Sequence, residues 1–195
     1  MSVDLRIYFN FRSPYCYLAS KTMFALLDDY DVNLLWRPLG EWDGRSPPDR
    51  AKAKIPLTRQ DVARWAKRMA IPFNPPPLTT DPTLAGIGSL LAERNGCLRN
   101  YVVETMQSEW GLGLDIGQRH ILITVAERVG LERGEFESTL DDPAQRKELS
   151  KNWEEAQSLG VIGVPSFVIN DQIFWGNDRL DFVREYLAEL RLARI

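Results

Sequence analysis

The sequence predicts an α/β protein in which both ends of the chain contribute strands and the middle is helical. Residues 4–11 and 31–39 have the composition of strands and enclose a helical segment, which together make a βαβ unit. Near the other end, two short strands at residues 166–169 and 172–175 precede an amphipathic helix over residues 179–193. The segment between these groups carries helical rather than strand signals.

Local signals support each element of the first unit. Residues 4–11 alternate in polarity and favour strand-forming types. The following helix is expected to run from Pro14 to Asp28. Ser13 is a favoured N-cap, and the N–H that proline lacks has no helical partner at the first position. Residues 31–39 then supply a second strand.

The middle of the chain begins with a predicted loop over residues 40–55, which contains Gly44 and the Pro47-Pro48 pair. A capping-box variant at residues 58–61 then starts a helix that ends near Met69. The remaining predicted segments are an extended proline-rich stretch at 72–77 and helices at 82–94, 98–110, 118–129, 132–140 and 143–158.

The order of these elements predicts how the chain is organised. A βαβ unit, a long helical insert and a ββα unit are the order of a DsbA-like protein. We therefore predict a thioredoxin-like fold with a large all-helical insertion. The thioredoxin-like domain is expected to be split in sequence, over residues 1–40 and 160–195, with residues 41–159 as the helical insertion domain.

Composition excludes several classes of function. The 195 residues are 44% hydrophobic and 26% charged, which is ordinary for a soluble globular protein. A net charge of −3 argues against a nucleic-acid partner, for which a basic face is usual. No apolar run approaches the roughly 20 residues that span a membrane, and no secretory signal is visible at the N-terminus. We therefore expect a cytoplasmic protein with neither nucleic acid nor membrane as partner.

The cysteines and the histidine make a disulfide or a metal site unexpected. Cys16 and Cys97 are far apart in sequence, so two reduced thiols are favoured over a structural bridge. A single histidine, His120, cannot supply a multi-histidine metal site. No metal is expected.

Ser13 occupies the place where a thioredoxin-type redox protein has its attacking cysteine. Free N–H groups and the helix dipole favour negative charge there, which in redox relatives lowers the pKa of the cysteine. With serine in that place, the same field would stabilise a thiolate carried by a bound ligand, and glutathione is the natural candidate. Helix capping alone also explains Ser13, but together with Val164-Pro165 we favour the functional interpretation.

Further candidates lie late in the chain. Pro165 is expected to be cis and to present the backbone of Val164 to a bound peptide, although a trans-proline at an edge strand is the alternative. Asn177 and Asp178 either cap the last helix or hold the γ-glutamyl end of glutathione. Trp175 is a candidate wall for an aromatic substrate.

Cys16 occupies the resolving position of a C-x-x-C motif that lacks its first cysteine. Without that cysteine it cannot close a local disulfide. We expect it to pack beneath the helix start, with a mixed disulfide to glutathione as the alternative.

Four segments resemble one family. The stretches at residues 9–19, 160–167 and 174–180, with a weaker one at 61–65, are similar to the 2-hydroxychromene-2-carboxylate isomerases. These enzymes are close to the kappa-class glutathione transferases and share the DsbA-like fold. The resemblance covers essentially the whole chain and implies a cytoplasmic homodimer that uses glutathione.

The resemblance also implies roles for single residues. The family serine matching Ser13 contacts the glutathione sulfur, and Val164, before Pro165, pairs with the peptide backbone. The pair matching Asn177 and Asp178 binds the γ-glutamyl group. Two further positions concern the carboxylate side of the peptide: a family lysine falls on Lys54, and a family asparagine falls on Arg45.

The implied reaction is a reversible thiolate addition. The glutathione thiolate adds to the hydroxychromene, the hemiketal ring opens, and a carbon–carbon bond rotates before the thiolate leaves. The product is trans-o-hydroxybenzylidenepyruvate, as in naphthalene-type degradation. Arg12 or Lys54 would bind the carboxylate of this small aromatic substrate. The alternatives are a kappa-class-like transferase or peroxidase, a DsbA-type thiol-disulfide oxidoreductase, and a non-catalytic glutathione-binding protein.

Overall fold

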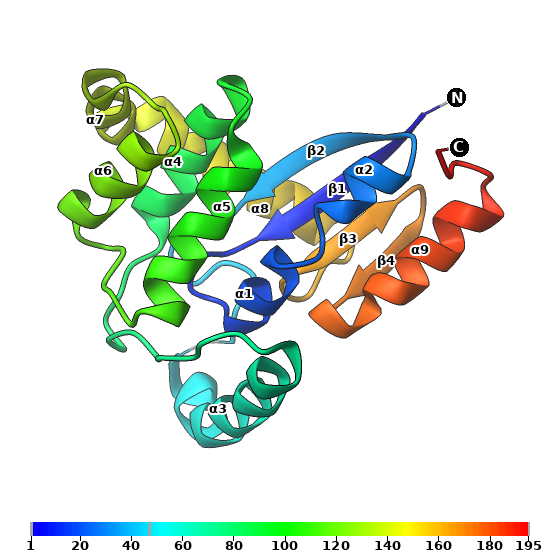
Figure 1. Cartoon of the computed structure of the whole chain (residues 1–195), viewed down its shortest axis with the longest axis horizontal. Coiled ribbons are helices and arrows are strands. Elements are labelled where there is room, and N and C mark those ends of the chain that lie inside the picture. Colours follow the sequence, from blue (N-terminus) through cyan, green and yellow to red (C-terminus); the bar gives the residue numbers. More distant parts are fainter. Residues whose placement is uncertain (1, 47, 195) are drawn as a thin grey trace.

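A four-stranded mixed sheet forms the centre of the computed structural model, which describes residues 2–46 and 48–194. The strand order is β2-β1-β3-β4, so the first and last parts of the chain meet inside one sheet (Figure 1). β1 pairs in parallel with β2 and antiparallel with β3, which is antiparallel to β4. The thioredoxin-like fold predicted from the sequence is confirmed. The strands are Val3–Phe9 (β1), Val32–Pro38 (β2), Ser166–Ile169 (β3) and Gln172–Trp175 (β4).

The helix that connects β1 to β2 is divided, which corrects the prediction of one helix over residues 14–28. It consists of α1 (Pro14–Ser20) and α2 (Ala25–Asp29), separated by turns. The Ser20 hydroxyl donates to the Tyr17 carbonyl at 2.7 Å, a local bond of the kind that competes with helix hydrogen bonds. The break allows Met23, in the intervening turn, to be fully buried.

Helix α3 (Pro48–Met69) begins about ten residues earlier than predicted, so the second half of the expected loop at 40–55 is helical. The prolines misled the prediction, because proline at the start of a helix does not break it. Alanine, lysine and arginine dominate the next turns, and all three have high helix propensity. Pro56 lies inside the helix. Pro47, which was part of the predicted loop, lies outside the described residues.

The other predicted helices of the insert are confirmed. The segment at 98–110 differs in detail, because its α-helix passes into a π-helical segment, η1 (Gln107–Gly111). The bounds of these helices are Thr83–Arg94 (α4), Leu98–Met106 (α5), Arg119–Arg128 (α6), Arg133–Asp141 (α7) and Pro143–Ser158 (α8). Figure 1 shows α4 to α7 gathered beside the end of the sheet, α8 behind the sheet, and α3 apart from this group and near α1.

The C-terminal helix is shorter than the predicted 179–193. A 3-10 segment, η2 (Asn177–Arg179), leads into α9 (Leu180–Glu189). Arg191 has a left-handed backbone (φ 58°), a conformation that ends helices. Ala193 then forms an isolated antiparallel bridge with Tyr30.

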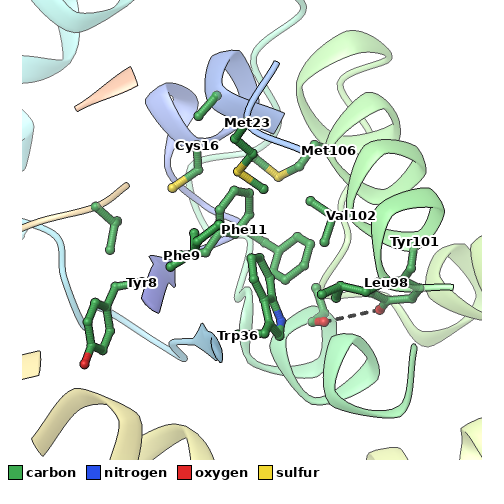
Figure 2. Packing of buried hydrophobic residues seen from close by; sticks show 14 of the residues in the cluster. Tyr8, Phe9, Phe11, Cys16, Met23, Trp36, Leu98, Tyr101, Val102 and Met106 are labelled. Carbon is green, nitrogen blue, oxygen red and sulfur yellow. Dashed lines mark hydrogen bonds between the residues drawn. The ribbon is translucent and has the colours of Figure 1, made fainter. Parts of the chain in front are cut away.

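One hydrophobic core joins the sheet to the helical insert (Figure 2). Phe9 lies 5.2 Å from Phe11 and 5.1 Å from Trp36 between ring centroids, and the indole of Trp36 donates to Ser89 of α4 at 2.9 Å. This packing anchors the loop that follows β1, where Ser13 lies. Among the described residues, no helix has the length and apolar character required to cross a membrane.

Candidate active site

Ser13 is fixed at the start of α1 by a tight turn after β1. The Asn10 side chain is fully buried, and its amide donates to the carbonyl oxygens of Asp43 (3.0 Å) and Gly40 (3.3 Å). Its Oδ1 accepts from the Arg12 N–H at 2.9 Å, and the Asn10 carbonyl accepts from the Ser13 N–H at 2.9 Å. A single asparagine therefore ties this turn to the segment after β2.

The Ser13 hydroxyl caps α1 and lies beside the Cys16 thiol. Its Oγ accepts from the Cys16 N–H at 3.3 Å. A hydrogen bond between this hydroxyl and the Cys16 sulfur opposes the rise in the pKa of the thiol, and among the described residues no protein oxygen or nitrogen accepts from the hydroxyl. Because α1 has only seven residues, local N–H groups rather than a long helix dipole surround this hydroxyl.

The segment before β3 has the predicted conformation, because the Val164-Pro165 bond is cis. Within the described part of the chain, the N–H and carbonyl of Val164 form no hydrogen bond with protein. The Pro165 carbonyl accepts from the Gly176 N–H at 2.9 Å, which ties this segment to the end of β4. A Cβ atom at Gly163 would lie 2.6 Å from the indole nitrogen of Trp175, so the glycine makes room for this ring.

A cavity of about 770 Å³ brings most of the candidate residues together. Its wall includes Ser13 and Arg12 from the turn, Lys54 from α3, Val164 from the cis-proline segment and Trp175 from β4. The volume is within the range of small-molecule sites, roughly 300–1,000 Å³. Other aromatic rings in the wall, which sequence reasoning did not single out, are Trp42, Phe73 and Trp110.

Three candidates lie outside this wall. Pro165 stands behind Val164, while Asn177 and Asp178 are in η2. Asp178 is about half exposed and accepts from Arg179 at 2.8 Å. Its charge nevertheless acts on Tyr15, a wall residue whose pKa is raised to about 12 by burial, by its hydrogen bond to Asp61 and, to a smaller extent, by Asp178. The η2 segment, which carries Asp178, packs against α1, the helix to which Tyr15 belongs.

Cys16 packs beneath the helix start, as predicted. It is fully buried in the core cluster of Figure 2, and burial raises the pKa of its thiol to about 12. The hydrogen bonds with Asn10 and Ser13 oppose this shift without reversing it. Cys97 is also unpaired, and burial raises the pKa of its thiol as well. Neither cysteine resembles the ionised nucleophile of a redox enzyme.

A fully buried carboxyl group, Glu109 in η1, was not expected from the sequence. Its Oε1 lies 3.6 Å from Nη1 of Arg12, and neither of its oxygens has a hydrogen-bond partner in the described structure. Burial raises the pKa of Glu109 to about 8, against the opposing effect of Arg12 and Arg45. The sequence did carry a signal, since Glu109 follows Val102 and Thr105 at helical spacing on a face that proves to be buried.

Two arginines stand at this end of the cavity. The Arg12 guanidinium lies over the Trp110 ring at 5.1 Å and donates to the Pro77 carbonyl at 2.9 Å. Arg45 lies over the Trp42 ring at 4.3 Å. Burial, and secondarily the charge of Arg12, lower the pKa of Arg45 to about 10. Together they form a cationic end next to Ser13, which suits a carboxylate ligand.

Comparisons with known proteins show the family of this chain. Residues 4–188 match the DSBA-like thioredoxin domain. A 2-hydroxychromene-2-carboxylate isomerase of Sphingobium xenophagum is 30% identical, with 97% of this chain and all of that protein covered. The chain belongs to the 2-hydroxychromene-2-carboxylate isomerase family.

Two further members of this isomerase family extend the likeness. One from Pseudomonas putida is 27% identical over 97% of this chain and 96% of its own length. A solved 2-hydroxychromene-2-carboxylate isomerase structure superimposes with a TM-score of 0.82 at 26% identity, covering 96% of this chain and 95% of that one. The family likeness thus includes the helical insert as well as the sheet.

Proposed function

We propose that this protein is a glutathione-dependent cis-trans isomerase that converts 2-hydroxychromene-2-carboxylate to trans-o-hydroxybenzylidenepyruvate. The observation that carries the proposal is that Ser13 lines the cavity, while the neighbouring Cys16 is fully buried and its thiol has a raised pKa. A site of this kind can hold a thiolate but cannot provide one. The names of the family members supply the reaction.

The residues around Ser13 fit glutathione. The unpaired N–H and carbonyl of Val164, placed by Pro165, offer the edge on which a peptide backbone pairs. Lys54 is in the wall and would pair with the glycine carboxylate. Asn177 and Asp178 would hold the γ-glutamyl end, with Asp178 turning from Arg179 toward the ammonium group.

When bound, glutathione would supply a thiolate that adds reversibly to the hydroxychromene, after which the hemiketal ring opens and the former double bond can rotate. Ser13 would donate a hydrogen bond from its hydroxyl to the sulfur and stabilise the anionic form. Arg12 would bind the carboxylate of the substrate. Trp175 would cover the aromatic ring and limit access of water.

The test is the absorbance change of 2-hydroxychromene-2-carboxylate, followed with and without glutathione. We expect turnover only with glutathione, and a loss of about 10²-fold or more in kcat for Ser13→Ala with an unchanged circular dichroism spectrum. Turnover without glutathione, or full activity of Ser13→Ala, would contradict the proposal.

Two control reactions separate the alternatives. Conjugation of a chloronitrobenzene without any isomerisation would place the protein with the kappa-class-like transferases. Reduction of insulin that depends on Cys16 would indicate a thiol-disulfide oxidoreductase. We expect neither result, because the Cys16 thiol is buried and carries a raised pKa.

A further inference from the structure

The wall of the cavity is cationic although the protein as a whole carries a net charge of −3. No aspartate or glutamate is part of this wall in the described structure. The lining cations are Arg12, Arg45, Arg50, Lys52, Lys54 and Arg59. Helix α3 supplies four of these cations, Arg12 comes from the turn before α1, and Arg45 comes from the loop after β2.

Most of these cations lack an acidic partner. Arg12 approaches Glu109 at 3.6 Å. For the other five, no carboxylate oxygen of a described residue lies within 4.0 Å. Arg45 donates to the Glu41 carbonyl at 3.4 Å, and Lys54 donates to the Ser46 hydroxyl at 3.1 Å, so both bind neutral oxygens.

Most arginines elsewhere in the molecule have an acidic partner. Ten of the fourteen arginines outside the cavity lie within 4.0 Å of a carboxylate oxygen of a described residue, whereas Arg64, Arg68, Arg94 and Arg191 do not. Two carboxyl groups, Glu109 and Asp61, contact wall residues of the cavity without being part of the wall. The paired residues are Arg6, Arg37, Arg99, Arg119, Arg128, Arg133, Arg146, Arg179, Arg184 and Arg194.

This charge exceeds what the proposed reactants require. The glycine carboxylate of glutathione takes Lys54, its γ-glutamyl carboxylate lies with the ammonium group at Asn177 and Asp178, and the thiolate takes the Ser13 hydroxyl. The single carboxylate of a hydroxychromene takes Arg12. Four lining cations are left without an anion, namely Arg45 and Lys52 together with two guanidinium groups of α3, Arg50 and Arg59. Both of these guanidinium groups of α3 are exposed, so a ligand reaches them without displacing protein contacts.

We propose that the aromatic substrate carries a second acid group, and that one of two guanidinium groups of α3, Arg50 or Arg59, binds it; the two residues are about 13.5 Å apart along the helix. The inference rests on the proposed function and specifies its substrate class, an aromatic ring with two anionic substituents. A carboxylate and a sulfonate share the required chemistry, since both accept two hydrogen bonds from a guanidinium. The aromatic rings of the wall provide the surface for the ring between the two acids.

Binding of unreactive probes tests this without any turnover. Calorimetry would compare naphthalene-2-carboxylate, naphthalene-2,6-dicarboxylate and 6-sulfonaphthalene-2-carboxylate in the presence of glutathione. At an ionic strength of about 50 mM we expect the two diacids to bind about tenfold more tightly than the monoacid. The two diacid probes also show whether a carboxylate or a sulfonate fits better.

Variants locate the effect. The double variant Arg50→Gln/Arg59→Gln should bind the monoacid and the diacids within about twofold of each other, because the added acid has lost its partner whichever of the two arginines binds it. Arg64→Gln is the matched control, because Arg64 lies on the same helix, is exposed and is not in the cavity wall. It should retain the preference for diacids.

The outcomes separate this inference from the proposed function. Equal binding of monoacid and diacids by the wild type would overturn the inference even if the isomerase assay succeeds. If Arg64→Gln loses the preference for diacids as fully as the double variant does, the preference comes from the overall surface charge. That result would also overturn the inference. A preference that depends on Arg50 or Arg59, in a protein without isomerase activity, would support the diacid site and refute the proposed reaction.

Discussion

The buried carboxyl group of Glu109 makes the stability of the fold depend on pH. The pKa of Glu109 is raised from 4.5 to about 8, so the folded protein holds a proton that the unfolded chain releases at lower pH. Each tenfold difference in proton affinity corresponds to about 1.4 kcal/mol. The whole shift therefore corresponds to roughly 5 kcal/mol, present in full below pH 4.5 and lost progressively as the pH rises toward 8.

Glu109→Gln removes this dependence while preserving the shape of the side chain. The free energy of unfolding of the wild type should fall relative to that of Glu109→Gln by roughly 4 kcal/mol between pH 5 and pH 8.5. The charges of Arg12 and Arg45 already oppose the shift, so the figure includes their attraction. The glutamine variant should then be the more stable protein above neutral pH.

Urea unfolding at pH 5, 7 and 8.5 measures this difference, with tryptophan fluorescence as the signal. Glu104→Gln, at a partly exposed position on the preceding helix, controls for the change of residue type. Parallel stability curves for the wild type and Glu109→Gln would refute the reasoning. They would mean that Glu109 stays ionised in the folded state, as a strong ion pair with Arg12 would require.

Three further outcomes follow from the site. Asn10→Ala removes the buried amide that ties the turn to the loop after β2, so the free energy of unfolding in urea should fall by about 2–4 kcal/mol. An unchanged midpoint of urea unfolding would contradict this role of Asn10. Gly163→Ala forces the Trp175 ring out of its position, so we expect KM to rise at least about tenfold. A KM like that of the wild type would show that this ring does not contact the substrate. Ellman's reagent should label Cys97 in the native protein and should label Cys16 only after unfolding. If the labelling of the native protein is lost in Cys16→Ala, the reactive thiol is Cys16 and the expectation is wrong.

Local patterns predicted the frame of the fold because their physical causes are local. Alternating polarity marked β1, and the Ser13-Pro14 pair marked the start of α1. The Val164-Pro165 pair indicated the cis peptide bond next to the cavity, because X-Pro bonds are the only peptide bonds that are commonly cis. Val164 lines the same cavity as Ser13. These three signals placed Ser13 and Val164, which lie on opposite ends of the sequence, in one site.

Other features depend on tertiary contacts that no local pattern encodes. The start of α3 was obscured by prolines, which are as acceptable in a first helical turn as in a loop. Glu109 is buried because α5 and η1 pack against α1, and burial of a carboxyl group contradicts its usual preference for solvent. Arg45 was assigned only by comparison with a family asparagine, and its stacking on Trp42 is visible only in the fold.

The position of β3 in the sheet has a consequence for the order of folding. β1 pairs with β3, which lies beyond the whole helical insert, so this contact closes a very long loop and is slow to form. During synthesis, β1, β2 and the insert leave the ribosome before β3 and β4 exist. Until then one edge of β1 lacks its partner, and Ser13 faces solvent where Val164 later stands. The site would therefore form only after β3 has joined the sheet. Binding of a ligand to the cavity would then indicate that the sheet is complete.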